Sequence, residues 1–190
     1  MERRELLKMI VAATGAALVG LPALVQGQSP AAGAIAFSAA DIALLDEIAE
    51  TILPRTKTPG AKEAGAGAFM ARFVSDCYTA REQATFRAGL VDIDKRAGGR
   101  FTSLTPQART ELLRTLDAEA RTHLARVTET GNAQSANAMP HPFTMIKQLA
   151  IFGFFTSKVG ATEVLQYVAV PGRYDGDVAY VPGTPAWATG

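Results

Sequence analysis

Side chains that could carry acid–base, nucleophilic or metal chemistry are few in this sequence. It contains one cysteine, Cys77, and two histidines, His123 and His141. A single cysteine cannot form an internal disulfide, a cysteine-rich zinc site or an iron–sulfur cluster. The histidines stand far apart along the chain, which does not indicate a shared metal ion. The sequence therefore predicts no catalytic, cofactor-binding or metal-binding residue in this chain.

The remaining chemical motifs are fragments. Cys77 falls on the apolar side of a helical pattern, which favours a packed thiol over a nucleophile. Gly65-Ala-Gly67 does not follow a strand, as a phosphate-binding loop would. Asp175-Gly-Asp177 lacks the later ligands of a calcium loop, so we expect a turn there.

Length and charge exclude several classes of protein. The chain has 190 residues, which fits one domain, and 48% of them are apolar, which is enough for a packed core. The formal net charge is only +1. Such a weak field does not favour binding to nucleic acid.

The first residues have the pattern of an export signal. Arg3, Arg4, Leu6, Leu7 and Lys8 resemble the twin-arginine translocation signal, and a Gly- and Ala-rich apolar run follows from Met9 to Val25. The alternative is an ordinary secretory leader or a membrane anchor with a chance arginine pair. We expect residues 1–34 to be a leader and linker, with the cleavage site left open.

The body of the chain, residues 35–169, reads as helices. Ser38 and the Thr79–Glu82 capping box begin helices, and Leu53-Pro54 and Gly98-Gly99 end them. In the first helix Asp46, Glu47 and Glu50 are expected on the solvent side. We expect helices over about 38–53, 64–77, 79–97, 105–130 and 143–158, and a short turn over 162–167, with Leu112, Leu113, Leu116, Leu124 and Val127 of the fourth helix buried. The fold class is all-α, a small bundle of about five or six helices.

One predicted helix is apolar on nearly every side. In residues 147–158, Phe152, Phe154 and Phe155 point in different directions, and such a helix must be covered all round. It is either the centre of the bundle or partly an interface with another protein, and the two interpretations are compatible.

Residues 170–190 form a Pro- and Gly-rich stretch without helical period, which predicts an extended C-terminal arm. Arg173, Tyr174, Tyr180 and Trp187 are residue types enriched in interface hot spots. We interpret the stretch as an arm that lies along a partner. The alternative is a frayed terminus.

Three segments together resemble the gluconate 2-dehydrogenase subunit 3 family, the small subunits of bacterial FAD-dependent gluconate, glucose and sorbitol dehydrogenases. The first segment is Ile52-Leu-Pro-Arg-Thr-Lys-Thr-Pro-Gly-Ala61, continued to Phe69. The others are Phe154-Phe-Thr-Ser-Lys-Val-Gly160 and Tyr167-Val-Ala-Val-Pro-Gly-Arg-Tyr-Asp-Gly-Asp177.

This resemblance implies a noncatalytic subunit without a cofactor of its own. Its partners would be a flavoprotein of the glucose–methanol–choline oxidoreductase type and a multihaem cytochrome c subunit. The flavoprotein would hold FAD, and the resemblance leaves open whether it also holds an iron–sulfur cluster. The small subunit would assist folding and stability of the flavoprotein. Its leader would carry both through the twin-arginine translocase to the periplasmic face of the inner membrane.

Two other classes of function stay open at this stage. One is a free-standing periplasmic enzyme with an unrecognised site. The other is an independent exported scaffold, or a membrane-tethered protein, with no flavoprotein partner.

Replacing both leader arginines, Arg3→Lys with Arg4→Lys, should leave this chain and its flavoprotein in the cytoplasm, because the twin-arginine route requires the pair. Cell fractionation followed by a dehydrogenase assay measures this. Unchanged dehydrogenase activity in the periplasm would contradict the prediction.

Overall fold

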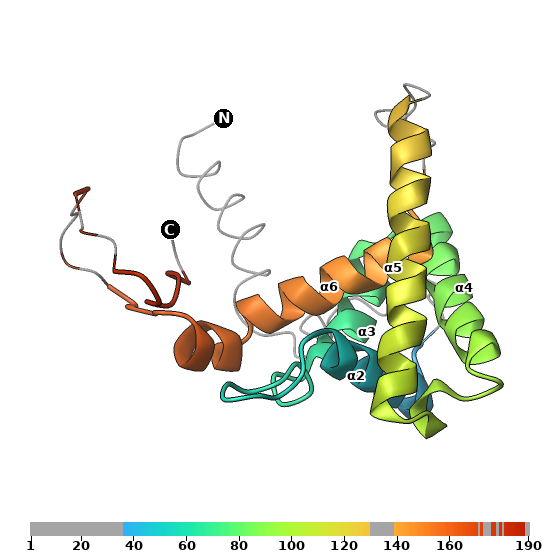
Figure 1. The fold of residues 1–190 in the computed structure, drawn as a ribbon, viewed down its shortest axis with the longest axis horizontal. Coiled ribbons are helices and arrows are strands. Elements are labelled where there is room, and N and C mark those ends of the chain that lie inside the picture. The colour runs from blue at the N-terminus through green and yellow to red at the C-terminus, as the bar shows by residue number, and fades with distance from the viewer. Residues whose placement is uncertain are drawn as a thin grey trace, which may run out of the picture. The chain divides into compact units, whose positions relative to one another are not determined.

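The computed structural model describes residues 36–129, 139–170, 172, 176–177, 179 and 181–188. These residues belong to a compact unit that spans Ile35–Gly190. They form the α-helices α2 (Ala39–Ile52), α3 (Ala66–Cys77), α4 (Ala80–Arg96), α5 (Pro106–Glu129) and α6 (Pro142–Thr156), the 3₁₀ turn η1 (Phe101–Ser103) and the π-helical turn η3 (Gly160–Val164) (Figure 1). The described part of the chain contains no β-strand, so the predicted all-α fold is confirmed.

Local capping determines where the first helices begin. The Ser38 hydroxyl accepts from the backbone N–H of Asp41, and the Asp41 carboxylate accepts from the N–H of Ser38, which completes the capping box of α2. Thr79 and Glu82 repeat this arrangement at α4. These bonds lower the pKa of both carboxyl groups, because they stabilise the charged form.

Proline fixes the starts of the last two helices. Pro106 is the first residue of α5, and the Thr105 hydroxyl before it accepts from the N–H of Ala108. Pro142 begins α6, and the preceding His141 is its N-cap. Since proline has no N–H, its position adds no unsatisfied donor to the first turn of either helix, and its ring fixes φ near the helical value.

Helix α6 is the centre of the bundle and packs against α2, α3, α4 and α5. Its covered side chains belong to the main core, and the fully buried Phe86 of α4, Phe101 of η1 and Leu45 of α2 complete that core. The buried residues of α6 are Phe143, Met145, Ile146, Leu149, Ala150, Gly153 and Phe154. The low amphipathicity of this helix follows from contacts on several sides.

Two expectations from the sequence are wrong. Leu124 is 61% exposed, although Leu113 and Leu116 of the same helix are buried. Figure 1 shows the C-terminal part of α5 extending past the other described helices, so the apolar period continues where none of those helices covers it. Cys77 is exposed because it is the last residue of α3, where that helix leaves the core.

Within the described residues, no helix combines the length and the apolar character that a membrane span requires.

The Phe86→Ala variant should lose about 3–5 kcal/mol of the free energy of unfolding, because a fully buried ring leaves a cavity between α4 and its neighbours. Val91→Ala on the same helix removes an exposed side chain and should stay within about 0.5 kcal/mol of wild type. Urea denaturation followed by circular dichroism compares the two. Equal stability of the variants would contradict this assignment of the core.

Candidate functional site

The strongest candidate for function is an apolar surface on the C-terminal half of α6. Phe152 is 47% exposed and Phe155 is 38% exposed, and Ile151 beside them is also exposed. We call these three residues the α6 strip. Three large apolar side chains on successive turns form a patch of the kind that marks an interaction site.

Two aromatic rings of α3 pack against Phe152 of the α6 strip. The ring centroid of Phe152 lies 5.7 Å from that of Phe69 and 5.8 Å from that of Phe73, both in edge-to-face geometry. Such pairs restrict the side-chain rotamers of Phe152. The ring is therefore held in place before any partner binds, which lowers the entropy lost on binding.

Phe154 differs from its two neighbours. Only 4% of this side chain is exposed, and it packs in the core. The sequence analysis grouped Phe154 with Phe152 and Phe155 as candidate interface residues. The structure places Phe154 inside the chain, because consecutive helical residues point about 100° apart.

Exposed large apolar side chains gather in the C-terminal part of the described chain. Outside it, the exposed large apolar residues of the described ranges are Val91 and Leu124. In the C-terminal part they are Ile151, Phe152, Phe155, Tyr167, Val168, Val170, Val181 and Trp187. A distribution this uneven is not expected of scattered surface residues.

Residues 186–188, near the end of the C-terminal arm, contact Gln166, which follows the last helical turn. The N–H of Gln166 donates to Ala186 O and the N–H of Ala188 donates to Gln166 O, both at 2.8 Å, which makes an isolated parallel bridge beside Trp187. The Gln166 side chain also donates to Pro185 O at 2.5 Å. Trp187 is 56% exposed at this bridge. Arg173, Tyr174 and Tyr180 lie outside the described residues, as do Arg3, Arg4, Leu6, Leu7 and Lys8 of the leader.

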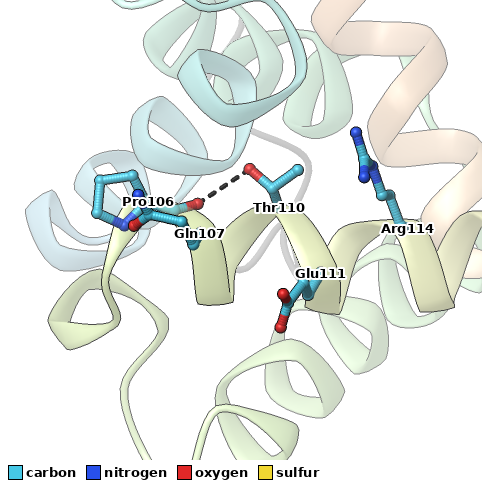
Figure 2. Close-up of a pocket in the computed structure, with 5 residues that line it drawn as sticks. All are labelled: Pro106, Gln107, Thr110, Glu111 and Arg114. Atoms are coloured by element: carbon cyan, nitrogen blue, oxygen red, sulfur yellow. Dashed lines mark hydrogen bonds between the residues drawn. The ribbon is translucent and has the colours of Figure 1, made fainter.

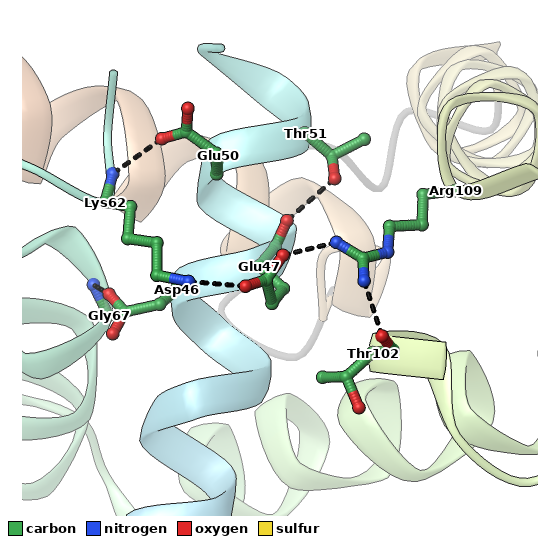
Figure 3. A network of polar contacts seen from close by, with 8 residues as sticks. All are labelled: Asp46, Glu47, Glu50, Thr51, Lys62, Gly67, Thr102 and Arg109. Atoms are coloured by element: carbon green, nitrogen blue, oxygen red, sulfur yellow. Dashed lines mark hydrogen bonds and ion pairs between the residues drawn. The ribbon is translucent and has the colours of Figure 1, made fainter. Parts of the chain in front are cut away.

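A second feature is the loop of residues 54–62, which we call the proline loop. One carboxylate of α2 holds both of its ends, since Glu50 accepts from the N–H of Arg55 at 2.8 Å and from the N–H of Lys62 at 2.9 Å. Close by, Asp46 accepts from the N–H of Gly67 at 2.9 Å, at the start of α3. Figure 3 shows these carboxylates side by side along α2. The loop is thus braced by charged acceptors rather than by a core of its own.

Two glycines make room for these carboxylates. A Cβ on Gly60 would lie 2.4 Å from both carboxylate oxygens of Glu50 and 2.7 Å from the backbone nitrogen of Arg55. A Cβ on Gly67 would lie 2.4 Å from the Asp46 oxygen and 2.7 Å from the Asp46 nitrogen. Both positions therefore require glycine for the close approach of the backbone.

Glu47 links the proline loop to α5. Its carboxylate pairs with Lys62 at 2.5 Å and with Arg109, and Arg109 also donates to Thr102 O of η1 at 2.5 Å (Figure 3). The hydrogen bond from Lys62 holds the pKa of Glu47 below its ordinary value. A carboxylate that is ionised and shared between two cations is a structural clamp and a poor general base.

The sequence analysis placed Asp46, Glu47 and Glu50 on the solvent side of α2, and it missed this brace. The sequence does contain a signal that could have predicted these bonds. Three acidic residues lie on one helix, and the loop that follows directly has backbone N–H groups without helix or strand partners. Such groups require acceptors when they are partly buried.

The cavities of the described chain are open hollows. One of about 340 Å³ lies along α5 and is lined by Pro106, Gln107, Thr110, Glu111 and Arg114 (Figure 2). Its side chains come from a single helix, and the Thr110 hydroxyl is already bonded to Pro106 O. Within the described ranges, no group of three or more His, Cys, Asp or Glu side chains is placed to hold a metal ion.

The other hollow, of about 510 Å³, lies between α5 and the start of α6 and brings His123 and His141 together. Their ring centroids are 6.0 Å apart. This proximity could not be predicted from the sequence, because it depends on how the start of α6 packs against α5.

The described residues thus define a small all-α protein with a braced loop and an exposed apolar surface on α6. Residues 39–172 match the family described as gluconate 2-dehydrogenase subunit 3, and the chain belongs to this family. The match covers every helix that the structure describes, the proline loop and the α6 strip. No curated protein and no solved structure matches the chain.

If the bonds of Glu50 hold the proline loop in place, a variant that lacks them should be more sensitive to protease. Glu50→Ala removes the acceptor of two loop N–H groups, so trypsin should cut after Arg55 and Lys57 about tenfold faster, given that each lost bond costs about 1 kcal/mol or more. The matched control is Glu111→Ala on the exposed side of α5. Mass spectrometry of timed digests measures the rates, and identical rates in both variants would contradict the brace.

Proposed function

We propose that this chain is a noncatalytic subunit of a periplasmic FAD-dependent dehydrogenase complex that acts on a sugar or a sugar acid. In this proposal it assists folding and stability of the flavoprotein subunit and takes that subunit through the twin-arginine pathway. The observation that carries the proposal is the exposed α6 strip, in a chain that belongs to a family of dehydrogenase subunits.

We assign catalysis to the partner subunit because of what the polar side chains of this chain contact. In the described residues, one polar network is built from Glu47, Lys62 and Arg109, and its charges pair with one another. Its effect is to hold the proline loop against α2 and α5. We therefore assign FAD, and the chemistry of substrate oxidation, to the flavoprotein, with a multihaem cytochrome c subunit as the next electron acceptor.

The export part of the proposal rests on residues 1–34. A twin-arginine leader serves cargo that folds in the cytoplasm, and a flavoprotein with bound FAD is such cargo. One leader on the small subunit suffices for both chains if they assemble before export. Assembly before export in turn requires an interface that is preformed, as the supported ring of Phe152 is.

The test is copurification of the flavoprotein from cells that express both subunits. Phe155→Asp, alone and with Ile151→Asp, places charge on the α6 strip and should lower the copurified flavin absorbance at least tenfold, because a buried unpaired charge is costly. The Phe155 ring also contacts the ring of the buried Phe154, with 5.0 Å between the centroids. The matched control is Val91→Asp, an exposed apolar position on α4, which should copurify as wild type does.

Circular dichroism of each variant separates loss of the interface from loss of the fold. Removal of residues 170–190 should also weaken copurification while helix content is kept. Undiminished flavin in both the strip variants and the truncated chain would contradict the proposal. A colourless purified wild-type chain would favour an independent exported scaffold.

A further inference from the structure

Two histidines join the start of α6 to α5. His141 is the N-cap of α6, and its Nδ1 lies 3.2 Å from the backbone nitrogen of Phe143. His123 of α5 has its Nε2 3.1 Å from the carbonyl oxygen of Met139. The His123 ring therefore contacts the segment that precedes α6, and the His141 ring caps the first turn of α6 itself.

The partners of the two rings determine where the protons are. A backbone N–H can only donate, so Nδ1 of His141 must carry a lone pair and its ring must be neutral. A carbonyl can only accept, so Nε2 of His123 carries a proton, which it has in one neutral tautomer and also in the charged ring. The His123 bond thus survives protonation of its ring, whereas the His141 bond does not.

The surroundings oppose a positive charge on His141. The cavity beside it is lined from α5 by Glu119, His123 and Arg126. From α4, Arg96 pairs with both Asp92 and Glu119, at 2.8 and 2.7 Å, so one net negative charge of this group remains, and these two carboxylates act to raise the pKa of His141. Burial, and next the nearby His123, lower the pKa of His141 below its ordinary value of about 6.5. The positive end of the α6 dipole acts in the same direction.

We propose that His141 is a proton-sensitive cap, and that the first turn of α6 loosens when the surroundings become acidic. With a neutral ring the cap is intact. Protonation places a hydrogen on Nδ1, facing the N–H of Phe143, and the bond is lost. The ion pair of Lys147 with Asp117, at 2.6 Å, lies further along the same two helices and keeps the middle of α6 attached.

The sign of the pH dependence follows from this arrangement. Because the folded state binds the proton more weakly than the unfolded state, the stability from His141 is complete above about pH 6.5. It falls as the pH drops from there through the lower folded pKa. An exported protein meets the pH of its surroundings directly, so the response does not depend on the proposed partner.

The test compares thermal unfolding of the full-length chain with that of His141→Asn. Asparagine is a good N-cap acceptor and does not titrate. Between about pH 7.5 and about pH 5, wild type should lose about 2–4 °C more in Tm than the variant, which is the shift expected for one cap in a chain of this size. The matched control, His123→Gln, keeps a donor for Met139 O and should retain most of the wild-type response.

A second measurement keeps the proposal testable if His141→Asn does not fold. In an NMR titration of wild type, the His141 ring should titrate with a midpoint below about 6.5, and the amide of Phe143 should shift with the same midpoint. Equal losses of Tm in wild type and His141→Asn would overturn the proposal. A His141 midpoint at or above 6.5, or a Phe143 amide that does not respond, would do the same.

Discussion

Helix α6 carries apolar side chains on nearly every side, and the bundle covers only part of them. Four helices pack around it, which buries residues such as Ile146 and Phe154. In its C-terminal turns Phe152 packs on rings of α3, yet Phe152 and Phe155 remain partly exposed to water. Exposed apolar area of this kind lowers solubility unless another surface covers it. The core, the candidate interface and the proposed role in a complex all depend on this single helix.

The proline loop differs from α6, because charged side chains hold it in place. Glu50 satisfies backbone donors at both ends of the loop, and Glu47 connects it through Lys62 and Arg109 to α5. Ala61 at its end is part of the apolar core, and these charged contacts hold the exposed remainder of the loop. Gly60 in the loop and Gly67 after it allow the backbone to approach the two carboxylates closely.

Features decided by near neighbours in the chain could be predicted from the sequence. The capping box of Thr79 with Glu82 involves residues three positions apart, and Pro142 fixes its own backbone. Features decided by distant segments could not be predicted. The apolar period of α5 gives no sign that the bundle ends before Leu124, and no local pattern brings His123 to His141. The separation of Phe154 from Phe152 likewise depends on which neighbours cover α6.

The central claim is that the exposed surface of α6 belongs to a complex with a flavoprotein. The most direct measurement is purification of the tagged full-length chain from its native cells, with an absorbance spectrum of the eluate. The account predicts a flavin band, a larger copurifying chain, and dye reduction that depends on a sugar or a sugar acid. A colourless eluate that contains only the 20.0 kDa chain would contradict it.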